Sequence, residues 1–330
     1  MRTLKDRDLK LLEDIISLKQ NELHKVMRQY LHKHYSKVKT TIDYIYAEGD
    51  IPIALVAHLD TVFPQPPEEV YYDQRKGVIF GSDGLGADDR TGIWMIIQII
   101  RLGLRPHIIL TTDEESGCVG ASMLVKDEPK CPFKDLRYLI QLDRRGKCDC
   151  VFYDCENQEF EEYVEKFGFI TELGSFTDIS VICPEWKIAG VNLSVGYINE
   201  HTKSELLFIQ PMLSTLDKVK NMLTQKEIPA FKYIPSPYSY LGGWNYYNFS
   251  STGKSEYQVQ CACCKKITVD LDTIPVKKKE GGVCFYCSDC IGTNDNIDWC
   301  LNCGEAYEID PNVDTIYCRD CRKAREVKNV

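Results

Sequence analysis

The stretch HIILTTDEESG places two glutamates, Glu114 and Glu115, directly after an apolar run. Adjacent negative charges at the end of a buried strand are costly unless a cation meets them. Other apolar segments end in the same way, since His58 and Asp60 follow IALVA and Asp143 closes YLIQL. Imidazole and carboxylate groups suit zinc, and manganese or cobalt are alternatives. These residue types therefore indicate a metal site assembled from separate segments.

The segments that carry these residues alternate between strand and helix patterns. Strands are predicted within 39–62 (two strands around a turn at 48–50), 107–113, 137–143 and 189–199, and helices over 6–34, 91–103, 157–168 and 209–226. This alternation predicts an α/β fold with a mainly parallel central sheet flanked by helices. Ligands of such sheets bind outside the carboxyl ends of the strands. We therefore expect the polar residues to converge on one edge of the sheet.

No single motif in this set is specific. A His-x-Asp pair is common at surfaces, and the acidic loop GADDRTG, which contains Asp88, has the composition of an ordinary loop or helix cap. Adjacent glutamates are usually a solvated helix face. What distinguishes the sequence is the order in which these motifs follow strand ends, with His201 after the last predicted strand.

That order resembles the co-catalytic dizinc exopeptidases and amidohydrolases, which include peptidase T-like tripeptidases, glutamate carboxypeptidase-like enzymes and zinc aminopeptidases. The resemblance covers roughly residues 1–225. It is carried by AHLDT (57–61), GADDRTG (86–92), TTDEESGCVGA (111–121), QLD (141–143) and NLSVGYINEHTKSE (192–205).

The resemblance implies a role for each matching position. The implied metal ligands are His58, Asp88, Glu115, Asp143 and His201. Asp88 would bridge two metals, with its neighbour Asp89 as the alternative. Asp60 would orient the His58 imidazole, and Glu114 would be the general base. Thr177 and Asp178, in GSFTDIS, would border the substrate pocket.

The implied activity is hydrolysis of an amide bond, most simply by an exopeptidase acting on short peptides. An N-acyl amino acid deacylase and a non-catalytic adaptor or binding protein are the alternatives. Many relatives insert a second domain before the last histidine, whereas only 57 residues separate Asp143 from His201 here. The architecture therefore resembles single-domain aminopeptidases, and the lid residues that would indicate a substrate class are missing.

Cysteines are concentrated near the carboxyl end, where ten of the sixteen lie between Cys261 and Cys321. Without an export signal, metal binding explains such a cluster better than disulfides do. The predicted structural zinc ligands are Cys261, Cys264, Cys287 and Cys290 in one zinc ribbon and Cys300, Cys303, Cys318 and Cys321 in a second. In the first ribbon, a Cys284/Cys287 pair remains open as the alternative to Cys287/Cys290. In total we expect two catalytic and two structural zinc ions.

Composition also indicates the domain boundaries and the kinds of partner to expect. We predict a catalytic domain over 1–226, a Pro/Tyr/Gly-rich linker over 227–257, and zinc ribbons over 258–295 and 296–330. The formal net charge of −9 argues against a general nucleic-acid binder, and the tail from 256 carries ten basic and thirteen acidic residues. The ribbons either serve only to stabilise the chain, or they contact a protein partner or deliver substrate to the catalytic domain. No apolar run approaches the roughly 20 residues that span a membrane, and we expect a cytoplasmic protein.

Overall fold

The computed structural model describes residues 4–236 and, further along the chain, 258–265, 267–269, 273–279, 283–287, 290, 296–299, 306–310 and 319. The chain divides into two compact units, Met1–Trp244 and Asn245–Val330. Among the described residues, no helix is long and apolar enough to cross a membrane.

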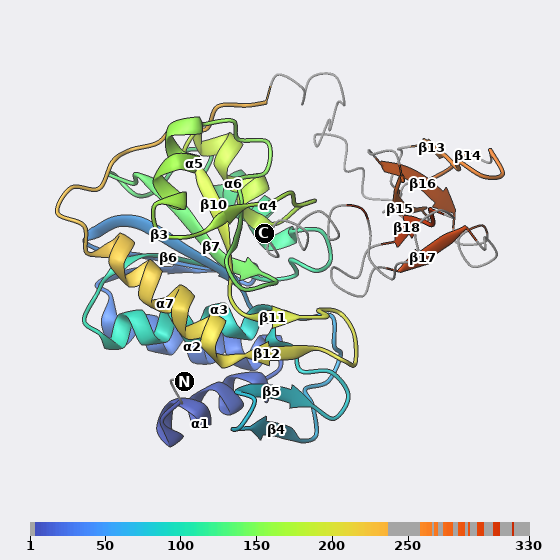
Figure 1. The fold of residues 1–330 in the computed structure, drawn as a ribbon. Helices are drawn as coiled ribbons and strands as arrows, with labels where there is room; N and C mark the ends of the chain where they lie inside the picture. The colour runs from blue at the N-terminus through green and yellow to red at the C-terminus, as the bar shows by residue number, and fades with distance from the viewer. Residues whose placement is uncertain are drawn as a thin grey trace. The chain divides into compact units, whose positions relative to one another are not determined.

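The first unit is built on an eight-stranded sheet with the order β1-β2-β6-β3-β7-β10-β8-β9 (Figure 1). Its strands are β1 (Lys37–Thr40), β2 (Tyr44–Glu48), β3 (Ile51–His58), β6 (Pro106–Thr111), β7 (Tyr138–Arg144), β8 (Asp149–Val151), β9 (Ile170–Thr171) and β10 (Gly190–Ser194). The four central strands β6, β3, β7 and β10 run parallel, and β2, β1 and β8 are antiparallel to their neighbours. The predicted α/β fold with a mainly parallel centre is confirmed.

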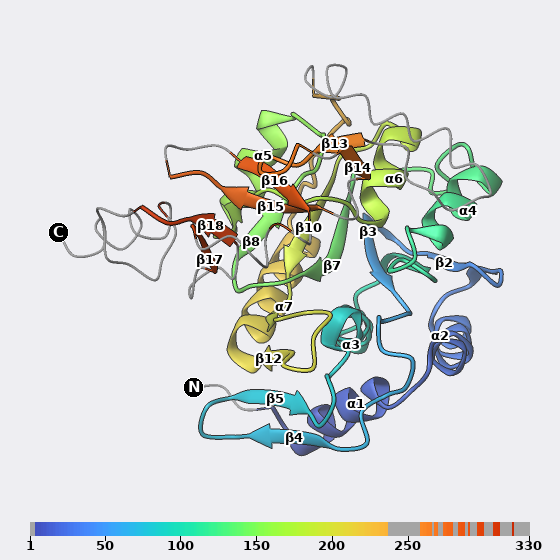
Figure 2. The ribbon, with the colours of Figure 1, turned by 90° about the vertical axis from the view of Figure 1, so that its right-hand side faces the viewer.

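Helices cover both faces of this sheet. They are α1 (Asp6–Ile16), α2 (Gln20–His34), α3 (Ala87–Arg101), α4 (Val119–Asp127), α5 (Gln158–Glu165), α6 (Asp178–Trp186) and α7 (Ile209–Leu223). Figures 1 and 2 show α3 and α7 on one face and α4 and α6 on the other. Side chains alternate along β3, so that Leu55 packs in the hydrophobic core on one face of the sheet and Val56 in the core on the other face. Burial on both faces explains why the central strands are nearly all apolar.

A small antiparallel sheet lies beside the main one. Its order is β11-β12-β5-β4, with β4 (Val70–Asp73), β5 (Val78–Gly81), β11 (Tyr197–Ile198) and β12 (Leu206–Phe208). The predicted strand over 189–199 is therefore two strands in two sheets. The chain turns between them at Gly196, whose φ of 104° favours glycine. This turn carries the chain from the main sheet toward His201.

Two further segments differ from the predicted helix over 6–34 and the predicted linker over 227–257. The helical pattern over 6–34 forms two helices, α1 and α2, because the chain leaves the helix at Ser17–Lys19. Residues 227–236 pack on the first unit, where Phe231 contacts its core and exchanges main-chain hydrogen bonds with Arg137 and Ala189. The rest of the predicted linker lies outside the described residues.

The second unit contains short strand pairings, which are antiparallel except for the parallel pair β15–β18. β13 (Gln258–Gln260) pairs with β14 (Ile267–Val269), and a four-stranded sheet has the order β16-β15-β18-β17. Its strands are β15 (Thr273–Lys277), β16 (Val283–Cys287), β17 (Ile297–Trp299) and β18 (Ala306–Glu308). Cys300, Cys303, Cys318 and Cys321 lie outside the described residues, so the second predicted zinc ribbon stays a prediction.

Candidate metal centre

His58 is the last residue of β3 and is fully buried. Its Nδ1 lies 3.1 Å from Oδ1 of Asp60. Asp60 in turn accepts the main-chain N–H groups of Glu114 (3.1 Å) and Glu115 (3.0 Å), which follow the neighbouring strand β6. Burial opposes ionisation of Asp60, but His58 and these two amides outweigh it and hold its pKa below the usual value. The imidazole is thus fixed in orientation and its Nε2 is presented to the strand ends.

Asp88 lies between two imidazoles. Its Oδ1 is 3.0 Å from Nε2 of His58, and its Oδ2 is 3.2 Å from Nε2 of His201. Asp89 points elsewhere, since its carboxylate accepts the main-chain N–H groups of His58 (3.2 Å) and Gly92 (2.9 Å). Of the two adjacent aspartates, Asp88 is therefore the one that faces both histidines.

Asp143 lies near the end of β7 and faces the same imidazole nitrogen as Asp88, with 3.4 Å between its Oδ1 and Nε2 of His58. The Tyr197 hydroxyl donates to Oδ1 (3.0 Å), while Gln141 and Thr177 each donate to Oδ2 (2.9 Å). Burial works against the charged form, but His58, a hydrogen bond with Asp88 and the Thr177 hydroxyl keep the pKa of Asp143 below its usual value. The carboxylate is held ionised and in one orientation.

Glu115 and His201 complete the group on the other side of Asp88. Oε1 of Glu115 lies 2.9 Å from Nε2 of His201. The same oxygen is buried, yet it makes no hydrogen bond within the described part of the chain. Both atoms belong to the group of close ligand atoms that Asp88 completes, so they are placed to face one cation. His201 lies in a loop, has a φ of 63°, and leaves 49% of its side chain exposed.

Glu114 is half-buried beside the same cluster, and one of its carboxylate oxygens lies within 4.8 Å of ligand atoms of His58 and Glu115. Burial raises the pKa of Glu114 to about 9, and the carboxylates of Asp143 and Asp178 contribute in the same direction. The carboxylate has no imidazole contact as close as that of Glu115. The two adjacent glutamates therefore have different surroundings.

These donors fit a pair of divalent metal ions. Two groups, each with all ligand atoms within 4.8 Å of one another, share Asp88: His58, Asp88 and Asp143, and Asp88, Glu115 and His201. Burial opposes the charge on His58, but Asp143 and Asp60 raise its pKa, and contacts with Asp88 and Glu115 raise the pKa of His201 to about 11. The carboxylates thus attract positive charge at both places. Zinc, manganese and cobalt all accept such imidazole and carboxylate ligands.

Thr177 and Asp178, the predicted substrate residues, are both buried. The Thr177 hydroxyl contacts Asp143, and Asp178 accepts a hydrogen bond from the Thr111 hydroxyl (2.5 Å). Their contacts are with the protein, and a role toward substrate stays a prediction.

Several supporting residues were not identified from the sequence. Buried Glu205 accepts the N–H groups of Gly86 (2.5 Å), Asp88 (3.1 Å) and Leu85 (3.2 Å), and so fixes the loop that presents Asp88. Asn192 brackets the main chain of Asp143, accepting its N–H (3.0 Å) and donating to its carbonyl (2.9 Å). The one sequence feature that could have drawn notice to Glu205 is its position four residues after His201, in EHTKSE.

A pocket of about 600 Å³ adjoins the cluster. Its walls come from the α1–α2 junction, the proline-rich loop at 61–67 and the loop after β6, including Asp113, Glu115 and Ser116. Two of its lining residues, Asp60 and Glu115, also belong to the candidate centre. The pocket therefore opens directly onto the candidate centre.

Comparison with solved structures defines the class of this architecture. No protein-family model matches the sequence, and neither does any curated protein. The α/β unit nevertheless has the dizinc exopeptidase fold.

Three structures of that class illustrate the likeness. Aminopeptidase PepT from Bacillus cereus has a TM-score of 0.54 at 15% identity, covering 67% of this chain and 98% of that one. A Staphylococcus aureus tripeptidase has a TM-score of 0.55 at 14% identity, with coverage of 67% and 98%. A TET aminopeptidase from a marine sediment thaumarchaeon has a TM-score of 0.54 at 13% identity, with coverage of 68% and 97%. At these identities the likeness establishes the fold alone.

Proposed function

We propose that this protein is a metal-dependent exopeptidase that cleaves the amino-terminal residue from short peptides. The observation that carries the proposal is the position of Asp88, whose two carboxylate oxygens each face a different imidazole. A carboxylate in that position can bridge two metal ions about 3.5–4 Å apart. The dizinc exopeptidase fold supports the same conclusion.

Each metal would have its own ligands in addition to Asp88. His58 and Asp143 would hold the first, and Glu115 and His201 the second. When bound, divalent ions at these positions supply Lewis acidity, which polarises a peptide carbonyl and makes a nearby water more acidic. Asp60 would keep the Nε2 of His58 directed at the first ion, because it fixes Nδ1 on the opposite side of the ring.

Glu114 would act as the general base. It lies beside both ligand groups, and a carboxylate there can take a proton from the attacking water and deliver it to the departing amine. The apolar surroundings of Glu114 favour its protonated form, whereas cations bound beside it favour ionisation. These opposing influences leave Glu114 able both to accept and to release a proton.

The charge of the pocket supports recognition of the amino end. Its acidic lining residues are Asp60, Asp113 and Glu115. The cationic lining residues are Lys19 and Arg90, and the buried Arg90 guanidinium donates to the main-chain carbonyls of Asp60 and Leu18. Asp113 is the lining carboxylate that is neither a proposed metal ligand nor bonded to His58, and it can attract a protonated amine beside the metals.

The substrate class can be tested with peptides that differ only at their ends. Metal-replete protein is incubated with one short peptide as the free form, the N-acetylated form and the carboxyl-amidated form. We expect cleavage of the free and amidated peptides and none of the N-acetylated peptide. Release of acetate from the N-acetylated form would instead identify a deacylase. Absence of hydrolysis of all three, across a sequence-varied library, would favour a binding protein.

The base assignment can be tested with Glu114→Gln. We expect kcat to fall by about 10²–10⁴-fold because the amide cannot accept the proton. Metal content should stay that of the parent, since the proposed ligands are unchanged. Glu159→Gln, the same change at an exposed position on α5, serves as the matched control and should be fully active. A Glu114→Gln enzyme with the parent's kcat would rule out this role.

A further inference from the structure

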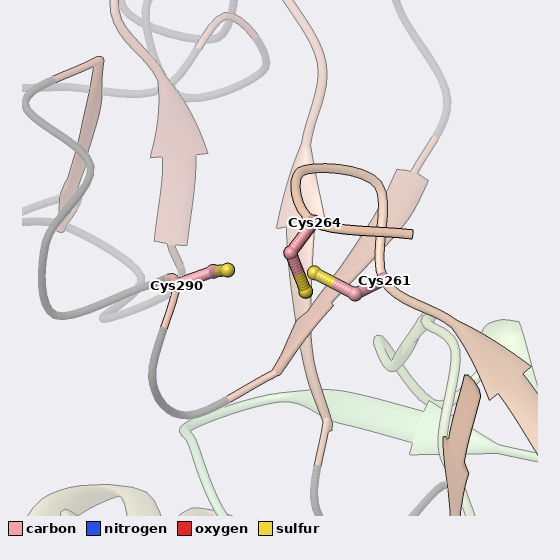
Figure 3. Close-up of side chains that lie close together, drawn as sticks. All are labelled: Cys261, Cys264 and Cys290. Carbon is pink, nitrogen blue, oxygen red and sulfur yellow. The ribbon is translucent and has the colours of Figure 1, made fainter. Parts of the chain in front are cut away.

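Three cysteine sulfurs come together in the second unit, far along the chain from the carboxylate centre. Cys261, Cys264 and Cys290 have sulfur atoms that all lie within 4.8 Å of one another. Figure 3 shows the sulfurs of Cys261 and Cys264 side by side, with that of Cys290 pointing toward them. Thiolates at corners of a tetrahedron around zinc are about 3.8 Å apart, given Zn–S bonds of about 2.3 Å. Sulfur atoms that all lie within 4.8 Å of one another are compatible with that geometry.

The first two cysteines lie on one tight turn. Cys261 follows β13, and the main-chain N–H of Lys265 donates to its carbonyl (3.0 Å), which closes the turn over residues 261–265. Lys265 has a φ of 63°, so the chain reverses directly after Cys264. The turn brings residues three apart onto the same side. A CxxC segment with this shape presents two sulfurs to one ion.

The remaining cysteines of this region make different contacts. Cys263 lies on the same turn, but its sulfur is not part of the group. The Cys284 sulfur instead lies 3.6 Å from the carbonyl oxygen of Val276. The sequence left open whether Cys284 or Cys290 joins the first zinc site. The contacts favour Cys290, because it faces the turn whereas Cys284 faces a neighbouring strand. Cys287 ends β16, and its side chain lies outside the described residues.

From these contacts we propose that Cys261, Cys264 and Cys290 bind one zinc ion as thiolates. Soft sulfur ligands select zinc over the hard divalent ions. Cys261 also belongs to the described hydrophobic cluster of this unit, together with Val276, Tyr286 and Ala306. A metal bound by Cys261 would therefore couple ion binding to the packing of this cluster. The proposal is independent of the peptidase activity.

Zinc-protected alkylation of the intact, unmutated chain tests the site directly. Cys263 and Cys264 are adjacent and both exposed, so without metal they should react alike with iodoacetamide. With zinc bound, peptide mass spectrometry should find Cys264 and Cys290 protected and Cys263 still alkylated. Equal protection of Cys263 and Cys264, or no effect of zinc on either, would overturn the proposal.

Zinc release by an organomercurial gives a second, quantitative readout in the full chain. The reagent displaces zinc from thiolates and leaves ions on carboxylate and imidazole ligands in place. Cys264→Ser and Cys290→Ser should each release about one zinc fewer per chain than the parent. Cys263→Ser is the matched control and should release as much as the parent. The proposal fails if Cys264→Ser releases the parent's amount, or if Cys263→Ser loses as much as the other two variants.

Discussion

The two halves of the candidate centre are held by the protein in different ways. The inner half consists of His58, Asp60 and Asp143, and the outer half of Glu115 and His201, with Asp88 between them. The His58 side chain is 1% exposed at the end of a central strand, whereas that of His201 is 49% exposed in a loop. Inner carboxylates accept several hydrogen bonds, while Oε1 of Glu115 accepts none from the described residues.

This difference indicates that the inner half is a preorganised set of side chains and that the outer half is an adaptable one. The proposed inner ligands are fixed by main-chain amides and buried side chains, so the metal site proposed there would be nearly complete before an ion arrives. Outer ligands lie on loops and can move when substrate or metal binds. We therefore expect the inner metal to bind more tightly and the inner ligands to be part of the fold's stability.

The largest effect is expected from His58→Ala. Removing the imidazole leaves Asp60 and Asp143 buried without their cationic partner, which should destabilise the metal-free first unit by about 3–5 kcal/mol. Urea unfolding followed by helical circular dichroism measures this, because the helices α1–α7 belong to the first unit. The matched variant is His201→Ala, for which we expect a smaller loss of stability, because the half-exposed imidazole is screened by solvent in its ion pairs with Asp88 and Glu115. Equal destabilisation by the two variants would contradict the comparison.

A second effect concerns the rate at which metal leaves. Under a chelator, the carboxylate centre should lose its two ions in separate phases, with rates that differ by about 10–100-fold. The fast phase belongs to the outer half, so it should be absent in His201→Ala while the slow phase remains. Stopped-flow detection of the chelated metal measures both phases. A single phase of two ions would show that the halves do not act separately.

The cluster itself follows from local sequence, because the carboxyl ends of parallel strands meet at one edge of a sheet. Residues at the ends of β3, β6 and β7 were therefore expected to converge, and the structure brings His58, Glu114, Glu115 and Asp143 together. Each lies directly at or after an apolar run that any reading of the pattern would identify as a strand.

Strand neighbours and supporting side chains do not follow from local sequence. The turn at 48–50 resembles that of a hairpin, yet β2 and β3 do not pair, because β6 lies between them and bonds to both. Glu205 supports Gly86 from 119 residues further along the chain. Such contacts depend on which distant segments the fold brings side by side. A buried carboxylate aimed at main-chain amides looks, in sequence, like any exposed glutamate.

The smallest effect, and the most informative about coupling between the halves, is expected from Asp60→Asn. Oδ1 of Asp60 serves His58 and the amide of Glu114, while Oδ2 serves the amide of Glu115. An asparagine amide retains one acceptor oxygen, so the Glu115 amide loses its partner in one orientation of the side chain, and the imidazole and the Glu114 amide lose theirs in the other. We expect affinity for the inner metal to fall by about tenfold, with the fold retained. Asp154→Asn, the same change at an exposed site, is the control.

If the slow phase of metal release accelerates and the fast phase does not, Asp60 acts through His58 alone. If both accelerate, it positions Glu115 as well, and the two halves are joined through this one carboxylate.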